Sequence, residues 1–200
     1  MPTVDIYPNH VFNNDWTVVG TGTASEVLLD NDYYNYLKSD TDTEYFEMDF
    51  YPPLDSDGLN IDTITSIQVH MWGDMSARGA SSTVTCDYRN SSGVIINSYT
   101  EDIVISTAGA HTDYPFTART TSDGSNAWKD DDSGGDGQVD DLRFRVTMDT
   151  TDTGGAYTLI TQMYLTVTYE TLPTPTYPSD DNVILKNGLI ELKNVLTIIK

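Results

Sequence analysis

The sequence predicts an all-β protein: an antiparallel β-sandwich with jelly-roll-like connections, a proline-rich linker and a short hydrophobic C-terminal assembly segment. Short stretches alternate between apolar and polar residues with the two-residue period of a strand. Polar turns rich in Asp, Asn, Gly and Ser separate these stretches at regular spacing, and no helical pattern precedes residue 182. At 200 residues in all, the sandwich is expected to be a single domain.

The first part of the chain, residues 1–20, is predicted to be an extended N-terminal arm and first strand that end at a Gly-rich turn. Next come Tyr33, Tyr34 and Tyr36, which could form a sugar-stacking platform or be half-packed strand residues; the second interpretation is preferred. Residues 45–50 alternate most clearly, with one face formed by Phe46, Met48 and Phe50.

Further strands are predicted over residues 61–72, 83–89, 94–99, 101–106, 111–120, 142–148 and 157–170. The Gly-, Ser- and Ala-rich loop 73–82 is expected to be a mobile tip. The turn Asn90-Ser91-Ser92-Gly93 predicts a hairpin. Cys86 is expected to point inward beside Val84 and Tyr88 as an inert thiol, and as the single cysteine it excludes an intrachain disulfide.

The predicted domain organisation is a sandwich over residues 1–171, a linker over residues 172–181 and a hydrophobic segment over residues 182–200. Three prolines within six residues make the linker stiff and extended. In the last segment, ten of 19 residues are Val, Leu or Ile, and its charge is +2 in a chain of net charge −21. We therefore expect it to dock on another protein surface or on a further copy of itself.

The expected contact residues of this C-terminal segment are its apolar side chains: Val183, Leu185, Leu189, Ile190, Leu192, Val195, Leu196, Ile198 and Ile199. Two geometries are open. Asn187-Gly188 is a strong two-residue hairpin signal, whereas the leucine spacing also fits a short coiled coil. Gly188 would weaken that helix by about 1 kcal/mol, so β structure is preferred. Either geometry leaves apolar side chains uncovered, which predicts a homo-oligomer, for example a trimer, or addition to a partner's sheet.

The net charge of −21 argues against binding to nucleic acid or to an anionic membrane, because both require a cationic surface. No apolar run approaches the ~20 residues of a membrane span. The N-terminus, Met-Pro-Thr-Val-Asp, lacks the basic and apolar regions of a secretory signal.

An acidic loop over residues 130–141 is the best candidate metal site, with calcium as the expected ion. Its carboxylates and central Gly135 partly match a calcium-binding loop. Gly134 replaces an oxygen ligand, however, and no helices are predicted to flank the loop. The alternatives are a solvated acidic loop, which is preferred, and a calcium or sodium site formed by Asp130, Asp132, Asp136 and Asp141.

No catalytic motif is recognisable, so the chain is expected not to be an enzyme. His10, His70 and His111 are not at metal-binding spacing, and neither a nucleophile elbow nor a phosphate-binding glycine loop occurs. Aromatic rings stack on sugars while Asp and Asn bind hydroxyl groups, so Trp72 and Trp128 are candidate glycan contacts. The alternative for Trp128 is that it covers the open end of the sandwich.

Several segments resemble one family: Trp16-Thr17, Pro52-Pro53, ITSIQV at 64–69, DGSNAW at 123–128, DDLRFRV at 140–146 and QMYLTVTY at 162–169. Together they are similar to the jelly-roll domains in virion proteins of tailed bacteriophages. The similarity covers residues 16–171. It implies a fold and a place on the virion surface, on capsids or tail appendages, after assembly in the host cytoplasm, and it implies no catalytic residue.

Two functions are therefore expected. The first is a structural protein of the virion, a capsid decoration or head-fibre protein attached to other virion proteins through its C-terminal segment. The second is a receptor- or glycan-binding module of a tail appendage, which would bind a host surface glycan.

Overall fold

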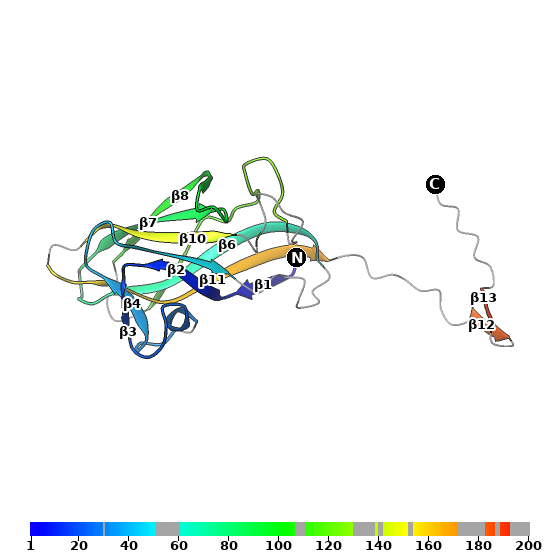
Figure 1. Ribbon diagram of the computed structural model, residues 1–200, viewed down its shortest axis with the longest axis horizontal. Helices are drawn as coiled ribbons and strands as arrows, with labels where there is room; N and C mark the ends of the chain where they lie inside the picture. The colour runs from blue at the N-terminus through cyan, green and yellow to red at the C-terminus, as the bar shows by residue number, and fades with distance from the viewer. Residues whose placement is uncertain are drawn as a thin grey trace.

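Two antiparallel sheets pack face to face as a β-sandwich, which confirms the predicted fold class (Figure 1). The computed structural model describes residues 1–29, 31–50, 61–106, 111–129, 139, 142–151, 154–171, 183–186 and 189–192. In these ranges the helical content is one 3-10 turn, η1 (Glu26–Leu28). A search of the same residues finds no helix with the length and apolarity needed to span a membrane.

The six-stranded sheet is built around two long strands that lie side by side, β6 (Ile61–Met75) and β11 (Thr158–Thr171) (Figure 1). The strand order is β3-β4-β11-β6-β9, and β1 also pairs with β11. The remaining strands are β1 (Thr3–Ile6), β3 (Thr17–Val19), β4 (Tyr36–Ser39) and β9 (Thr112–Pro115).

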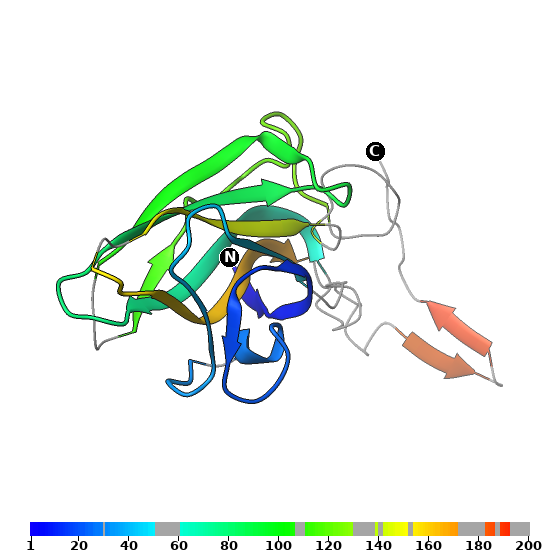
Figure 2. The same ribbon diagram turned by 60° about the vertical axis from the view of Figure 1, so that its left-hand side comes forward.

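The five-stranded sheet has the order β2-β5-β10-β7-β8 and covers the other side of the core (Figure 2). Its strands are β2 (Pro8–Asn14), β5 (Tyr45–Phe50), β7 (Ser82–Arg89), β8 (Ile95–Ile105) and β10 (Arg143–Thr150). The predicted hairpin around residues 90–93 is confirmed as β7 and β8.

The inward side chains of both sheets form one core, as the alternation predicts. Phe144 is fully buried, with its ring centroid 5.0 Å from those of both Tyr88 and Phe116. Cys86 is buried as expected, and its burial, with Asp87, Glu101 and Asp102 adding to the effect, raises the pKa of the thiol well above 9.0. The core is therefore closed around an un-ionised thiol.

Three local predictions are corrected. The extended arm is paired: β1 joins one sheet and β2 the other, because each supplies hydrogen bonds to an edge that would otherwise be open. The expected mobile tip at 73–82 is shorter than predicted, since β6 continues to Met75 and buries it together with Asp74, and the exposed part is residues 76–79. The two strands expected at 94–99 and 101–106 are one strand, β8, interrupted by an irregularity.

The C-terminal segment forms a hairpin of its own, β12 (Val183–Lys186) and β13 (Leu189–Leu192). Lys186 pairs with Leu189, so the two strands are connected through Asn187-Gly188 as the hairpin signal predicts. Over these two stretches the backbone is therefore β rather than the alternative coiled coil. The predicted linker, and Val195, Leu196, Ile198 and Ile199, lie outside the described residues.

Candidate functional site

The outward side of the six-stranded sheet carries a row of aromatic and polar side chains. Alternation along β6 turns Gln68, His70 and Trp72 away from the core, because Ile67, Val69 and Met71 fill it. On β11, Gln162, Tyr164 and Thr166 point outward for the same reason. We call the surface formed by Tyr7, His70, Trp72, Asp113, Gln162 and Tyr164 the outer aromatic face.

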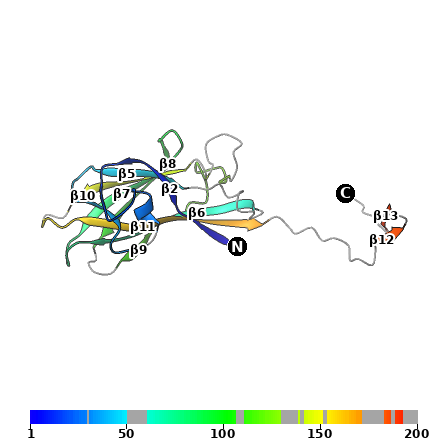
Figure 3. The ribbon, with the colours of Figure 1, turned by 60° about the horizontal axis from the view of Figure 1, so that its bottom comes forward.

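The row crosses from β1 to β9 perpendicular to the strands. Tyr7, just after β1, has its ring centroid 5.9 Å from that of Tyr164, and Tyr164 stacks on His70 with centroids 4.6 Å apart and ring planes 3° apart. The antiparallel register sets this stack, since Tyr164 lies directly opposite His70. Figure 3 shows β6 and β11, the strands that carry it, running alongside one another.

The far end of the row is charged. His70 Nδ1 lies 2.9 Å from Asp113 Oδ2, a contact between neighbouring strands β6 and β9. Asp113 is also directly opposite Trp72. The second carboxylate oxygen of Asp113, Oδ1, is buried without a hydrogen-bond partner among the described residues. This oxygen is shielded from solvent, so a ligand on the surface cannot reach it.

Tyr164 is held as a neutral donor. Burial, reinforced by the negative charge of Asp113, raises the pKa of its hydroxyl group above 10.0, and a hydrogen bond from the Trp72 side chain opposes part of that rise. The stacked Tyr164 and His70 rings cover each other's faces. Tyr7, which is 40% exposed, presents an apolar ring instead. The face thus combines apolar surface with fixed hydrogen-bonding groups.

The tryptophans named by the sequence analysis divide between core and surface. Trp72 lies in the outer aromatic face, half-buried. Trp128 is 3% exposed, and its indole N–H donates to the Arg119 carbonyl at 2.9 Å. Its ring has no open face for a sugar, so the prediction of Trp128 as a glycan contact is wrong. The bridge between Trp128 and Ile64 agrees with the alternative, a covering role.

The exposed tyrosines do not lie where the sequence analysis expected. Tyr33 and Tyr34 lie in the turn before β4 and are 53% and 81% exposed, so the prediction that they are half-packed strand residues is wrong. Tyr36 is a half-buried residue of β4, as predicted.

The predicted calcium ligands Asp130, Asp132, Asp136 and Asp141 lie outside the described residues. Elsewhere in the described chain, no cluster of three or more His, Cys, Asp or Glu side chains is arranged to hold a metal ion. Calcium binding by the acidic loop stays a prediction. The same holds for partner contacts through Val183, Leu185, Leu189, Ile190 and Leu192, of which only the backbone is described.

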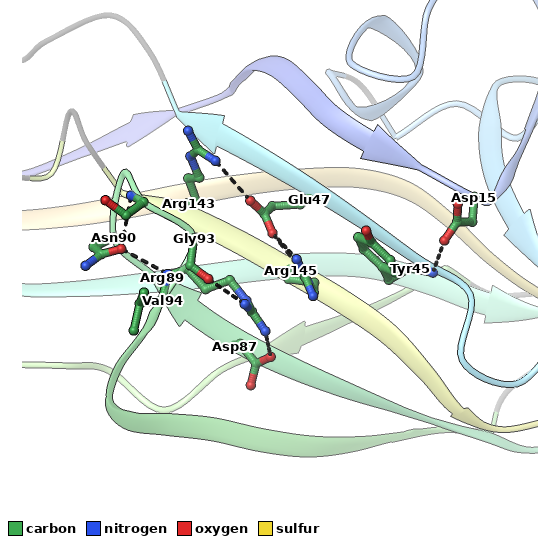
Figure 4. A network of polar contacts seen from close by, with 11 residues as sticks. Asp15, Tyr45, Glu47, Asp87, Arg89, Asn90, Gly93, Val94, Arg143 and Arg145 are labelled. Atoms are coloured by element: carbon green, nitrogen blue, oxygen red, sulfur yellow. Dashed lines mark hydrogen bonds and ion pairs between the residues drawn. The ribbon is translucent and has the colours of Figure 1, made fainter.

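The outward side of the five-stranded sheet is also polar, but its charges pair with one another (Figure 4). Glu47 is 2% exposed and lies between two guanidinium groups: Arg145 Nε and Nη2 donate to Oε2 at 2.9 and 2.7 Å, and Arg143 Nη1 donates to Oε1 at 3.3 Å. Arg89 likewise bridges Asp87 and the Gly93 carbonyl. These cations already have partners, so this face is best explained as a structural network.

Sequence reasoning missed four members of the outer aromatic face, Tyr7, Asp113, Gln162 and Tyr164, and gave His70 no role. The signal was present in part, because Gln162, Tyr164 and Thr166 alternate with the inward residues of β11. What the alternation does not contain is which strand lies beside β11. That information comes from the sheet order.

Comparison with known proteins gives structural neighbours only. No protein-family model matches the chain, and no curated protein matches it. Among solved structures, an arabinose-bound α-L-arabinofuranosidase (MgGH51) has a TM-score of 0.44 at 12% identity, and the match covers 80% of this chain but only 23% of the enzyme.

Two smaller neighbours are carbohydrate-binding modules. One is the CBM36-1 domain of a multidomain xylanase from the hindgut metagenome of Trinervitermes trinervoides (TM-score 0.43, 10% identity, 86% of this chain and 100% of the domain). The other is the CBM32 of AlyQ in complex with 4,5-unsaturated mannuronic acid (TM-score 0.39, 12% identity, 78% and 98%). With TM-scores below 0.5, these matches carry no argument about what this chain binds.

Proposed function

We propose that this chain is a non-catalytic glycan-binding module and that the outer aromatic face is its binding surface. The observation that carries the proposal is the row from Tyr7 through Tyr164 and His70 to Asp113, with Trp72 beside it. A sugar ring has apolar C–H surfaces and a rim of hydroxyl groups. The aromatic rings can cover the former, and the Asp113 carboxylate, the Tyr164 hydroxyl group and the Gln162 amide can bind the latter.

The preferred ligand is a neutral glycan. The face carries the carboxylates of Asp113 and, beyond Thr166, Asp5, whose Oδ1 accepts a hydrogen bond from the Thr166 hydroxyl at 2.7 Å. The chain as a whole has a net charge of −21. A uronic or sialic acid would be repelled by both, whereas neutral hydroxyl groups donate to carboxylates without that cost.

A glycan array followed by calorimetric titration tests the proposal. Tyr164→Ala and Trp72→Ala should each weaken binding to the best neutral ligand by about tenfold or more, since central aromatic contacts dominate binding. Phe12→Ala is the matched control, because Phe12 is an exposed aromatic residue of the five-stranded sheet, and its affinity should equal that of the wild type. Absence of neutral glycan binding by the folded wild-type protein, or unchanged affinity in both variants, would refute the proposal.

A second candidate, assembly into a phage particle through the C-terminal segment, is supported by a different observation. The strands β12 (VILK) and β13 (LIEL) pair with each other and form a sheet separate from the sandwich. A two-stranded hairpin is marginally stable alone, and these two are rich in apolar residues. A docking partner, such as further copies of the chain or another virion protein, would cover them.

Truncation after Thr171 tests this second candidate. Sedimentation analysis should show an oligomer for the full chain and a monomer for residues 1–171, with the melting temperature of the sandwich unchanged. Two results together would rule out the assembly role: the full-length chain sediments as a monomer, and it does not bind to phage particles when mixed with them. Because the outer aromatic face belongs to the sandwich, glycan binding by the truncated chain should be retained.

A further inference from the structure

A bulge in β11 creates a second cluster beside the outer aromatic face. The register of β11 against β6 shifts between Ile160 and Gln162, so Thr161 is an extra residue on its strand. Its side chain lies 2.7 Å from Asn31 Oδ1 and 3.0 Å from His111 Nδ1, measured from Oγ1. The bulge therefore ties the loop before β4 to the strand that carries Tyr164.

This cluster ends in exposed aromatic rings. The Tyr33 ring lies against the His111 ring with centroids 3.7 Å apart, and the neighbouring Tyr34 is the more exposed of the two tyrosines. The turn that carries them is fixed, because Asp32 accepts hydrogen bonds from the Tyr34 N–H at 3.0 Å and from the Asn35 side chain at 2.6 Å. The backbone of the turn is thus fixed, and the Tyr33 ring is held against His111 at the surface.

The cluster is continuous with the outer aromatic face. Gln162 is directly opposite Trp72, and its side-chain amide donates to the Leu29 carbonyl at 3.1 Å, which joins the loop to the face. His111 precedes Asp113 by two residues and so lies on the same side of the sheet. Burial lowers the pKa of His111, against the opposing charges of Asp74 and Asp32, and favours its neutral form. Its Nε2 is buried without a hydrogen-bond partner in the described part of the chain.

The distance between the two aromatic groups decides what can bind both. Tyr164 and Thr161 are three residues apart on β11, which corresponds to about 10 Å at the rise of a strand. A single sugar ring cannot reach from one group to the other. A linear glycan that follows β11 can.

Resting on the proposed function, we propose that Tyr33 and Tyr34 form a second subsite and that the ligand is a linear neutral glycan spanning both groups. The Tyr7–Tyr164–His70 row then binds one part of the chain, Trp72 lies between, and the two turn tyrosines bind the next part. Binding should consequently depend on chain length.

Calorimetric titration with cello-, xylo- and manno-oligosaccharides, each as a disaccharide and a hexasaccharide, tests this inference. The wild type should bind the hexasaccharide of the preferred series at least about tenfold more tightly than its disaccharide. The double variant Tyr33→Ala/Tyr34→Ala should lose that advantage while keeping the disaccharide affinity. Tyr164→Ala is the matched comparison and should weaken both lengths equally.

The outcomes separate the two proposals. Equal wild-type affinity for both lengths, or unchanged hexasaccharide affinity in the double variant, overturns the second subsite and leaves the proposed function standing. Binding to none of the six sugars and to no neutral glycan on an array overturns both. Because both tyrosine rings are exposed, the double variant should have the same melting temperature as the wild type. A lost length dependence then reports on binding rather than on folding.

Discussion

Replacing Glu47 by Gln should destabilise the sandwich, because this carboxylate neutralises two cations in a sheltered position. Glu47 is buried although it points away from the core. Arg143 and Arg145 flank it, and the turn at Gly93 lies above it, where a Cβ added to that glycine would be 3.8 Å from Glu47 Oε1. Glu47→Gln keeps the volume and one acceptor oxygen, so no cavity forms. What is lost is the charge.

The magnitude follows from how well the two arginines can be rehydrated. Removing one partner of a fully buried ion pair lowers the free energy of unfolding by about 3–5 kcal/mol. Here the Arg143 and Arg145 side chains are 25% and 24% exposed, so water can compensate part of the loss. Both guanidinium groups also lie over aromatic rings, Phe12 at 4.0 Å and Tyr45 at 4.2 Å, and these contacts remain. We therefore expect a loss of about 1–3 kcal/mol.

Urea unfolding followed by tryptophan fluorescence measures this loss. Trp16 and Trp128 are both buried and will report unfolding of the sandwich. With a denaturant dependence of about 2 kcal/mol per molar, the midpoint should fall by roughly 0.5–1.5 M. Asp102→Asn is the control on the same sheet. Its carboxylate is exposed and, among the residues that the structure describes, accepts from the Thr85 hydroxyl group, so its midpoint should change little.

A Glu47→Gln midpoint equal to that of the Asp102→Asn control would refute this reasoning. It would mean that the two arginines do not depend on Glu47 in the folded state. A buried ion pair can also be retained for specificity rather than stability. A triple variant in which apolar residues replace Glu47, Arg143 and Arg145 separates these explanations, since only removal of one partner leaves a charge uncompensated. If the triple variant is as stable as the wild type, the network contributes specificity rather than stability.

Three further outcomes are expected. Tyr88→Phe should lower the free energy of unfolding by about 1–3 kcal/mol in the same assay. The reason is that the Tyr88 hydroxyl group accepts a hydrogen bond from the buried Val69 N–H at 3.2 Å, across the two sheets. An unchanged midpoint would show that this N–H finds another partner. Cys86 should resist iodoacetamide at about pH 8.5, where a free thiol is half ionised, because burial raises the pKa of the Cys86 thiol. It should react once urea unfolds the chain. Rapid labelling of the native protein would contradict its burial. Burial also raises the pKa of Asp49, so its ionisation opposes folding at neutral pH and this penalty is relieved as the pH falls through the raised pKa towards 3.8. Asp49→Asn, which can still accept from the His10 N–H, should unfold at higher urea than the wild type at pH 7 and lose that advantage in acid, whereas a pH-independent difference would indicate another cause.

The amphipathic strands were predictable because each one encodes its own buried face. Phe46, Met48 and Phe50 are buried in β5, and Val84, Cys86 and Tyr88 in β7, as their alternation predicts. The pairing of VILK with LIEL also followed from a local signal, Asn-Gly. In each case the information lies within a few consecutive residues, and no knowledge of distant partners is required.

Irregular positions were not predictable, because a bulge inverts the two-residue period. The alternation of Met163, Leu165 and Val167, continued back along the strand, predicts an inward Leu159, yet Ile160 is buried in its place. The extra residue Thr161 lies between Ile160 and Gln162, and it exchanges the inward and outward positions on the two sides of the bulge. In β8 the expected break into two strands corresponds to Asn97 and Ser98, both with positive φ, where the register against β7 slips while the strand continues.

The outer aromatic face combines both kinds of information, and this explains why sequence reasoning found only Trp72. Outward residues of β11 are visible in the alternation, but Tyr164 meets His70 only because β6 is the neighbouring strand, and Tyr7 joins them only because β1 pairs on the other side. The bulge at Thr161 adds a further condition. It keeps Tyr164 outward while Ile160 stays in the core, and it turns Thr161 towards Asn31 and His111. One inserted residue thus places both proposed subsites on the same side of one sheet.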